Sequence, residues 1–168
     1  MGTSKKYNIH MRDAEKIEFE VREISVTDLR RGFFETLSNL AEVGRIGEDQ
    51  WNAKKILHEI TSYPFCKIFV AVKKDGEIVG SNTLLIEQKF IHNGGKVGHI
   101  EDVVTKKGYE GMGIGTALVG ESLRFARQMK CYKVILDCSE ENVSFYKKIG
   151  FKVYGISMRY DFMSTTAD

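Results

Sequence analysis

Two acidic residues and a run of glycines lie close together in the middle of this 168-residue chain. Glu101 and Asp102 open a short β-branched run, and Gly111, Gly113 and Gly115 follow it at alternate positions. An amphipathic pattern at helical spacing begins directly after the glycines. A strand that leads into a glycine-rich turn at a helix start can hold phosphate on its bare backbone N–H groups. A carboxylate facing the same pocket would add acid–base chemistry.

The glycine turn taken alone has a second interpretation, because closely spaced glycines more often make a tight turn or let a helix pack closely. The spacing is not the dinucleotide-binding fingerprint, since the third glycine of G-x-G-x-x-G is replaced by Thr116 or Leu118. It is not a P-loop either, because no Gly-Lys-Ser/Thr follows. The order of apolar strand, turn and helix, with acids just upstream, favours phosphate.

The acids differ in what their positions predict. On a regular strand the adjacent Glu101 and Asp102 point to opposite faces, which argues against a glycosidase pair that must flank one bond. Two solvated strand-end carboxylates are the alternative. Asp137 interrupts an otherwise apolar strand, Tyr132–Cys138, so we expect it to be buried and paired. Its partner would be either a substrate or a structural group such as Lys133.

Tyr146 lies on a predicted short helix beside Phe145 and Ile149. Its phenol could donate to a developing anion such as a leaving thiolate, although packing is the usual role of such a tyrosine. His92 and His99 lack partners at metal-ligand spacing, so no metal site is predicted. No Ser-His-Asp or Cys-His order nominates a covalent nucleophile.

The composition is that of an ordinary soluble protein, with 42% hydrophobic and 29% charged residues. A net charge of +2 favours neither nucleic acid nor an anionic membrane as a partner, and no signal or membrane-spanning segment is predicted. The odd count of three cysteines, without metal-like spacing, predicts buried reduced thiols in a cytoplasmic protein. We expect a mobile lead-in over 1–17, a single domain over 18–163 and a flexible tail over 164–168.

Hydrophobic periodicity and turn residues predict the elements that position these residues. Strands are expected at 19–24, 68–72, 78–90, 99–105 and 132–138, with one or two more in 151–162. Helices are expected from Thr27 or Asp28 to about Gly44, from Glu48 to about Ser62, from 114 to 130 and from 142 to 149. The order predicts an α+β fold around one central mixed, mostly antiparallel sheet flanked by helices, with a single parallel crossover.

Three further segments, together with the glycine motif, resemble those of a known protein family. They are Glu-Gln-Lys-Phe-Ile-His at 87–92, Cys-Tyr-Lys-Val-Ile-Leu-Asp-Cys at 131–138 and Asn-Val-Ser-Phe-Tyr-Lys-Lys-Ile-Gly-Phe at 142–151. With these motifs the chain resembles the GNAT superfamily of acetyl-CoA-dependent N-acetyltransferases. Within it, the chain is similar to the eukaryotic-type glucosamine 6-phosphate N-acetyltransferases over about residues 19–162.

This resemblance implies a GNAT-type sheet splayed at strands four and five, acetyl-CoA as acetyl donor and an amino-sugar phosphate as acceptor. The residues implied for the coenzyme are Val103, Val104, Thr105, Gly111, Met112, Gly113, Ile114, Gly115, Thr116, Asn142 and Tyr146. Those implied for the sugar phosphate are Lys89, His92, Glu101, Asp102, Tyr132, Lys133, Asp137 and Arg159.

The resemblance also implies a mechanism of direct attack in a ternary complex, in UDP-N-acetylglucosamine biosynthesis. A backbone N–H near Val103 would stabilise the oxyanion, and Tyr146 would protonate the leaving thiolate. Either Glu101 or Asp137 would take the ammonium proton, and the sequence does not separate them. The family forms intertwined homodimers with shared sugar sites, to which Arg159 would contribute.

Two positions depart from the family pattern. Glu110 stands at the start of the glycine motif, where glutamine or arginine is common, and an acid there opposes a pyrophosphate. The segment 39–44 offers no hydroxyl near the expected sugar phosphate. Two alternative functions therefore remain, an acetyltransferase for another small amine or a protein amine, and a non-catalytic acyl-CoA sensor.

Overall fold

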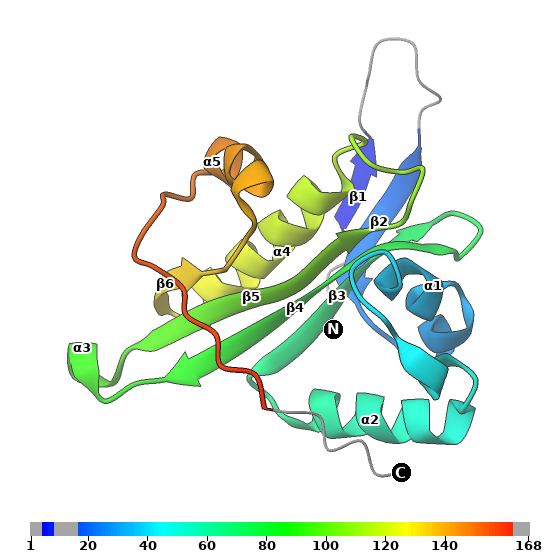
Figure 1. Ribbon diagram of the computed structural model, residues 1–168, viewed down its shortest axis with the longest axis horizontal. Coiled ribbons are helices and arrows are strands. Elements are labelled where there is room, and N and C mark those ends of the chain that lie inside the picture. The colour runs from blue at the N-terminus through cyan, green and yellow to red at the C-terminus, as the bar shows by residue number, and fades with distance from the viewer. Residues whose placement is uncertain (1–4, 9–16, 163–168) are drawn as a thin grey trace. The chain divides into compact units, whose positions relative to one another are not determined.

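The computed structural model describes residues 5–8 and 17–162 and forms two compact units, Met1–Leu136 and Asp137–Asp168. The strands of the first unit are β1 (Lys5–Asn8), β2 (Glu18–Glu23), β3 (Cys66–Lys73), β4 (Ile78–Gln88), β5 (Lys96–Thr105) and β6 (Cys131–Ile135) (Figure 1). Its helices are α1 (Phe33–Leu37), α2 (Gln50–Ser62), α3 (Ile91–Gly94) and α4 (Ile114–Gln128), with the 3-10 helices η1 (Val26–Arg30) and η2 (Gly44–Gly47). The second unit holds the 3-10 helix η3 (Glu140–Asn142) and α5 (Val143–Ile149).

The strands form one sheet in chain order, β1 to β6. Neighbours from β1 to β5 run antiparallel, and β5 and β6 run parallel because α4 carries the chain back to the same end of the sheet. The predicted α+β fold, with a mixed sheet and a single parallel crossover, is confirmed.

Strand β1 was not expected from the sequence, because residues 1–17 read as an aperiodic lead-in. Lys5–Asn8 pair antiparallel with β2, so Tyr7 lies opposite Phe19 and their rings stack with centroids 5.7 Å apart. A four-residue strand is too short to reveal a period of two, and its ordering comes from the neighbouring strand. The rest of the lead-in and the predicted tail over 164–168 lie outside the described residues.

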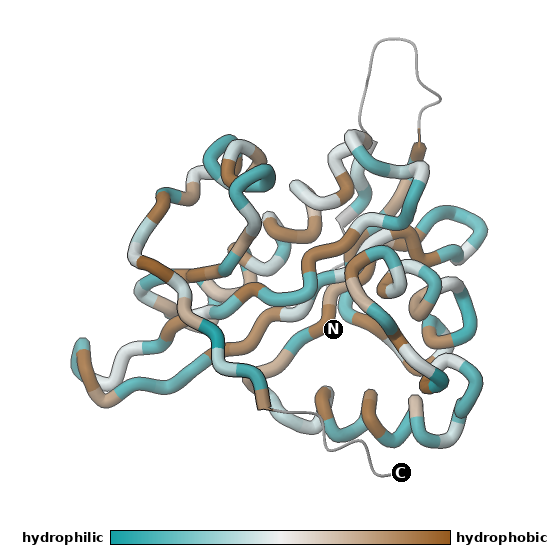
Figure 2. The backbone as a smooth tube through the Cα atoms, in the orientation of Figure 1, coloured by the Kyte–Doolittle hydropathy of each residue, from teal (hydrophilic) through white to brown (hydrophobic). Residues whose placement is uncertain are grey.

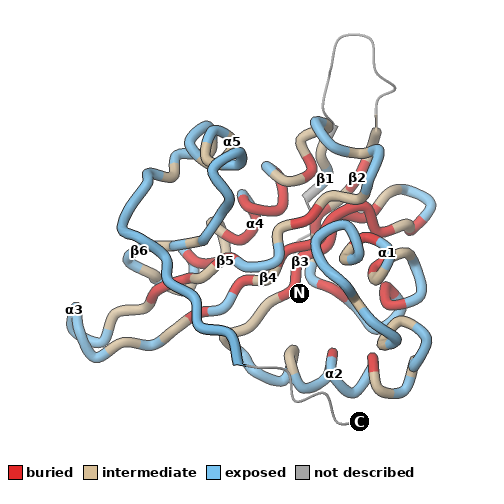
Figure 3. The backbone as a smooth tube through the Cα atoms, in the orientation of Figure 1, coloured by how far each residue is buried: buried red, intermediate tan, exposed pale blue. Residues whose placement is uncertain are grey.

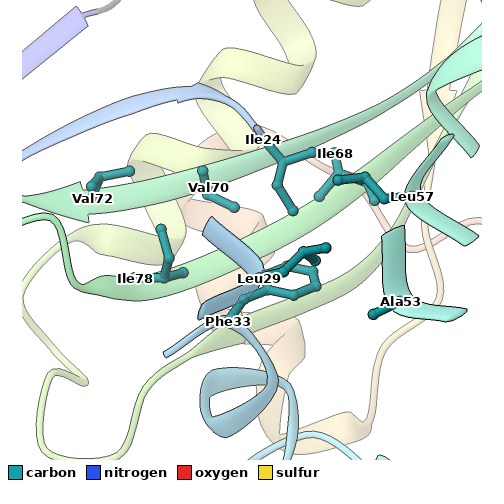
Figure 4. Packing of buried hydrophobic residues seen from close by; sticks show 9 residues of the cluster. All are labelled: Ile24, Leu29, Phe33, Ala53, Leu57, Ile68, Val70, Val72 and Ile78. Atoms are coloured by element: carbon teal, nitrogen blue, oxygen red, sulfur yellow. The ribbon is translucent and has the colours of Figure 1, made fainter. Parts of the chain in front are cut away.

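Different helices cover the two faces of the sheet (Figures 1 and 3). Helix α4 lies on one face, where the rings of Phe69 and Phe125 meet edge to face at 6.0 Å. Helices η1, α1 and α2 lie on the other. Figure 4 shows the hydrophobic cluster beneath these three helices, which consists of Ile24, Leu29, Phe33, Ala53, Leu57, Ile68, Val70, Val72 and Ile78. Strand β3 is buried on both faces over 68–72, as its unbroken apolar run predicts.

The single helix predicted from Thr27 or Asp28 to about Gly44 is wrong. Gly32 adopts a positive φ of 87° and divides the segment into η1 and α1. The segment nevertheless keeps one apolar face across the break, because Leu29, Phe33, Leu37 and Leu40 all line one cavity.

The start of η1 is fixed by a buried carboxylate rather than by Thr27. Asp28 is fully buried and accepts hydrogen bonds from the backbone N–H of Ser25 (2.7 Å) and from both terminal nitrogens of Arg22 (2.6 and 2.8 Å). Burial raises the pKa of Asp28, but the hydrogen bonds from Arg22 and Ser25 outweigh it and hold the pKa below its usual value. The pair ties β2 to η1.

In the second unit the short predicted helix is confirmed as α5, which ends at Gly150 with a positive φ of 112°. The one or two strands predicted in 151–162 are absent from the described residues. Figure 2 shows that this segment still alternates in hydropathy, as the prediction assumed. A strand needs a neighbour to bond, and the alternation alone does not supply one.

Burial of the cysteines also departs from expectation. Cys66 and Cys131 are half-buried, and burial raises the pKa of each thiol. Cys138 is exposed, so the prediction of three buried thiols is wrong for it. Every helix among the described residues is too short or too polar to span a lipid bilayer.

Candidate active site

The glycine turn has the backbone conformation that an anion cradle at the start of α4 requires. Gly111 and Gly113 adopt positive φ angles of 75° and 76°, and Gly113 is the residue that precedes α4. Residues other than glycine rarely adopt a positive φ, so the glycines are needed for the turn itself. Ala117 is the first residue of α4 whose N–H bonds back to a carbonyl before the helix, that of Gly113. The N–H groups of the first turn of α4 are thus available to an anion at the positive helix end.

Gly80 in β4, which no sequence motif singled out, determines how closely α4 packs against the sheet. A Cβ added to Gly80 in β4 would lie 2.5 Å from Cγ2 of Ile114 and 2.9 Å from Cδ1 of Leu118. Only glycine lets the first turns of α4 approach β4 so closely. An isolated glycine inside a strand pattern is a recognised sign of such an approach, so the sequence did contain a signal.

Charged side chains anchor the loop that leads into the turn. Glu77 accepts from Lys106 and Lys73, each at 2.7 Å, and from the hydroxyl of Tyr109 at 3.3 Å. The hydrogen bond from Lys106, and then that from Lys73, lowers the pKa of Glu77. Because Lys106 and Tyr109 lie in the loop between β5 and α4 and Glu77 belongs to the β3–β4 hairpin, this cluster ties the loop to the sheet.

Glu110, the unexplained acid, also has a structural partner. Its carboxylate accepts a 2.6 Å hydrogen bond from the backbone N–H of Gly108, within the loop. The side chain therefore stabilises the turn before the cradle. This contact gives the acid a local role that the sequence alone did not suggest.

Strands β5 and β6 separate beside the cradle. Their ladder joins Lys96–His99 to β6 and ends with the pair His99–Ile135. Among the described strands, residues 100–105 pair with β4 alone, so the other edge of β5 is open there. This is the splay predicted between the family's fourth and fifth strands, here β5 and β6. The open edge includes Val103, Val104 and Thr105, whose backbone could pair with an extended ligand.

A β-bulge reshapes the strand at the two acids. Glu101 lies opposite Thr83 and Val104 opposite Ser81, so Asp102 and Val103 together face the single residue between them on β4. Asp102 has a positive φ of 53°. The predicted opposite orientation of the acids assumed a regular strand, and the bulge removes that regularity.

A cavity of about 370 Å³ lies between the sheet and the α1–α2 side. Most of its lining is apolar and comes from η1, α1, η2 and α2. Its polar lining comes from Ser81, Thr83, Asp102 and Glu42. Asp102 therefore lines the same cavity as Thr83, the residue opposite Glu101. A volume of this size with a few polar groups suits a small-molecule ligand.

Four predicted sugar-binding residues lie elsewhere in the first unit. The rings of His92 and Tyr132 meet at an angle of 41° with centroids 4.3 Å apart, and Lys133 Nζ lies 5.8 Å from the Tyr132 ring centroid. Lys89 pairs with Glu87, which also contacts His99 Nε2 at 3.0 Å. These residues flank the start of β5, about 17 Å of extended chain before Glu101. Within one copy of the unit, Lys89 and His92 therefore lie well before Glu101 and Asp102 along the sheet.

The remaining predicted residues belong to the second unit: Asp137, Asn142, Tyr146 and Arg159. Asp137 is exposed and accepts from Ser157 Oγ at 3.2 Å, so its predicted burial is wrong because β6 ends two residues earlier. Arg159 is exposed and paired with Asp161 at 2.6 Å. Asn142 Nδ2 donates to Ser139 Oγ at 3.0 Å.

Tyr146 packs against the rings of Phe145 and Phe151, with centroids 4.8 and 5.9 Å away. Burial, and to a lesser extent Cys138, raises its pKa above the usual value. Its hydroxyl therefore keeps its proton at neutral pH and can act as a donor. Among the described residues no group of three metal-type side chains is gathered.

Known proteins resemble this chain over most of its length. The model of the acetyltransferase (GNAT) family matches residues 25–151. Glucosamine 6-phosphate N-acetyltransferase of Arabidopsis thaliana is 36% identical over 83% of this chain and 94% of its own length. The Candida albicans enzyme of the same name is 38% identical over 83% and 93%. The crystal structure of the Arabidopsis enzyme covers 86% of this chain and 98% of its own, with a TM-score of 0.80 and 37% identity. The chain therefore belongs to the GNAT acetyltransferase family.

Proposed function

We propose that this chain transfers the acetyl group of acetyl-CoA to the amine of glucosamine 6-phosphate, releasing CoA and N-acetylglucosamine 6-phosphate. The chain is an acetyl-CoA-dependent N-acetyltransferase by its family, and its relatives at 36–38% identity carry the name of this sugar substrate. The observation that carries the proposal is the open edge of β5 running from the bulge into the helix cradle. That geometry suits an extended thioester ending in a pyrophosphate.

In the proposed mechanism the coenzyme arm pairs with Val103–Thr105 and its pyrophosphate meets the N–H groups of Gly111–Thr116. The deprotonated sugar amine attacks the thioester carbonyl in a ternary complex, where proximity supplies much of the rate. The backbone N–H of Val103, at the bulge, would stabilise the oxyanion. Tyr146, protonated at neutral pH, would donate to the leaving thiolate.

The base remains one of two carboxylates, Glu101 or Asp137. Glu101 adjoins the bulge, which supports a position near the reacting carbonyl. Asp137 is exposed and needs no neutralising partner, which supports a direct contact with an ammonium. Separate Glu101→Gln and Asp137→Asn variants would distinguish them. The variant that lacks the base should lose activity near neutral pH and regain it at alkaline pH, whereas the other variant should keep its activity near neutral pH.

The acceptor is tested by thiol release from acetyl-CoA with glucosamine 6-phosphate, glucosamine and phenethylamine. The proposal expects the phosphorylated sugar to give the largest kcat/KM. Equal rates with glucosamine would contradict the phosphate part. The largely apolar cavity beside Asp102 makes phenethylamine the sharpest competitor, and its preference would identify an acetyltransferase for apolar amines instead.

Turnover separates an enzyme from an acyl-CoA sensor. Tyr146→Phe should lower kcat about 100-fold, within the range for a lost proton donor, and leave acetyl-CoA affinity nearly unchanged. Unchanged turnover in this variant would remove Tyr146 from the mechanism. Binding of acetyl-CoA by the wild type without turnover with any amine would favour the sensor.

We also propose that two copies form a homodimer with shared sugar sites. The segment 151–162 exposes apolar side chains at every second position, with Tyr154, Ile156, Met158, Tyr160 and Phe162 each more than 80% exposed. An alternating strand pattern this exposed is suited to pairing with a second copy of the chain. The scattered positions of Lys89 and His92 relative to Glu101 agree with a site completed by another copy.

The dimer is tested by mixing Glu101→Gln and Arg159→Ala, each first measured to be inactive alone, after mild dissociation. Sites shared between copies would recover about a quarter of wild-type activity in the whole mixture, because about half of the dimers would be mixed and each mixed dimer would hold one intact site. No recovery despite exchange would contradict shared sites. Sedimentation of Ile156→Asp should show monomers. A role in UDP-N-acetylglucosamine synthesis and a cytoplasmic location remain predictions for cell fractionation and metabolite measurement.

A further inference from the structure

A buried amide in the middle of β4 has no evident structural purpose. Asn82 is fully buried, and its Nδ2 donates to Ser122 Oγ on α4 at 2.7 Å. Its Oδ1 is the buried side-chain acceptor that lacks a hydrogen-bond partner among the described residues. Buried polar atoms are nearly always partnered, so this exception calls for an explanation.

Stability alone would favour an apolar residue at this position. The next residues on the same face of β4, Leu84 and Ile86, are buried and apolar. A valine at 82 would suit the strand, would pack against α4 and would leave no acceptor unpaired. Ser122 would then be free to bond the carbonyl one turn earlier in its own helix. The amide therefore weakens the core at a point where the fold does not need it.

Asn82 occupies one special place in the sheet. The register passes from Thr83–Glu101 to Ser81–Val104, so Asn82 is the single residue that faces both bulge residues, Asp102 and Val103. Asp102 holds a positive φ of 53°, which costs free energy in a residue with a side chain. A strained bulge keeps its shape only where its neighbours determine it.

We propose that Asn82 is a positioning residue for acetyl transfer, which holds the Asp102–Val103 bulge in a fixed place relative to α4. The inference rests on the proposed mechanism, in which the Val103 N–H meets the oxyanion. Through Ser122 the amide is attached to the helix whose first turn would hold the pyrophosphate. One side chain thus couples the anchor of the coenzyme to the group that would stabilise its reacting carbonyl.

The test compares Asn82→Val with Thr36→Val. Thr36 is also fully buried, and its hydroxyl donates to the Ile78 carbonyl at 2.9 Å, away from the bulge. Asn82→Val should melt at or above the wild-type temperature but lose about tenfold in kcat, with CoA affinity by calorimetry within twofold. Thr36→Val should show the reverse, a lower melting temperature with an unchanged kcat per folded molecule.

A purely structural role for Asn82 predicts that Asn82→Val melts earlier or fails to fold, or keeps its kcat, and each result would overturn the inference. Asn82→Ala and Ser122→Ala provide smaller changes, for which we expect kcat reductions of about tenfold and threefold. Wild-type protein without activity on glucosamine 6-phosphate would instead contradict the proposed function. The variants would then be compared with whichever amine the wild type acetylates.

Discussion

The proposed coenzyme side of the site and its proposed acceptor side are built in different ways. In the first unit, the proposed coenzyme side runs through one continuous stretch, from Val103 at the bulge to Thr116 in the first turn of α4. The acceptor side draws on η1, α1, η2 and α2 for its cavity and on the start of β5 for Lys89 and His92. Local backbone conformation defines the first, whereas packing between distant segments defines the second.

This difference predicts which changes each side tolerates. Glycines at positive φ and the free N–H groups of a helix start depend little on distant contacts. The stability of the short helices that line the cavity depends on the few groups that fix them to the sheet, because such helices are unstable alone. Acceptor-side variants should therefore lose folding stability first, and coenzyme-side variants should lose acetyl-CoA affinity first.

The largest expected effect is on the acceptor side, at the buried Asp28 carboxylate. Asp28→Ala should reduce the free energy of unfolding by about 3 kcal/mol, because it leaves the Arg22 guanidinium and the Ser25 N–H without their partner. Acetyl-CoA affinity of the folded protein should be unchanged. Asp49→Ala, which removes a milder cap at Asn52 N–H of α2, is the control and should cost about 1 kcal/mol. Urea titrations with calorimetry of CoA binding measure both quantities.

The Arg22–Asp28 pair should also make the free energy of unfolding depend on pH. The pKa of Asp28 is lower in the folded protein than in the unfolded chain, so its contribution is fully present above the usual aspartate pKa of about 3.9. The contribution is lost as the pH falls through the folded value. The gap in unfolding free energy between wild type and Asp28→Ala should therefore narrow below about pH 4. A constant gap down to pH 2.5 would contradict this assignment.

Next in size is Gly80→Ala on the coenzyme side. The added Cβ would lie 2.5 Å from Ile114, so α4 must shift, at a cost of about 2 kcal/mol. Because the shift moves the cradle, we expect acetyl-CoA affinity to fall at least tenfold. Gly120→Ala on α4 is the matched control, with open space around its Cβ, and should slightly stabilise the helix. If Gly80→Ala kept its acetyl-CoA affinity, the predicted difference between the coenzyme side and the acceptor side would be wrong.

A smaller effect is expected at Glu77, which joins the coenzyme loop to the hairpin. Glu77→Gln weakens the contacts to Lys106 and Lys73 and should raise the KM for acetyl-CoA about fivefold, with kcat nearly unchanged. The control, Glu59→Gln, removes an exposed pair with Lys55 at 3.9 Å and should change neither constant. Steady-state kinetics decide the point, and a fall in kcat alone would assign Glu77 a different role.

The smallest effect should come from Glu110. Replacing it with glutamine removes a negative charge beside the cradle while keeping an acceptor for the Gly108 N–H, so the KM for acetyl-CoA should fall about twofold. The gain should vanish at 1 M salt, where the Debye length is about 3 Å. An increase in KM would instead show that the carboxylate matters more for the turn than against the anion.

Much of the fold followed from local patterns. The strand at 68–72, the helix after the glycines and the short helix over 142–149 were all predicted, because each depends on residues that are neighbours in the chain. The break at Gly32 and the short strand β1 were not, because both depend on contacts with segments far away in sequence. The end of β6 before Asp137 belongs to the same group.

For the proposed site, the sequence by itself determined the conformation of the glycine turn, since glycine spacing and a following amphipathic helix specify a backbone conformation without help from elsewhere. The tertiary structure decided three things. Gly80 places α4 against the sheet, the bulge breaks the alternation of Glu101 and Asp102, and a hydrogen bond from Asn82, opposite the bulge, reaches Ser122 on α4. Strand register and helix approach are set by pairing and packing across the sheet, and no local pattern in one strand encodes its neighbour's register.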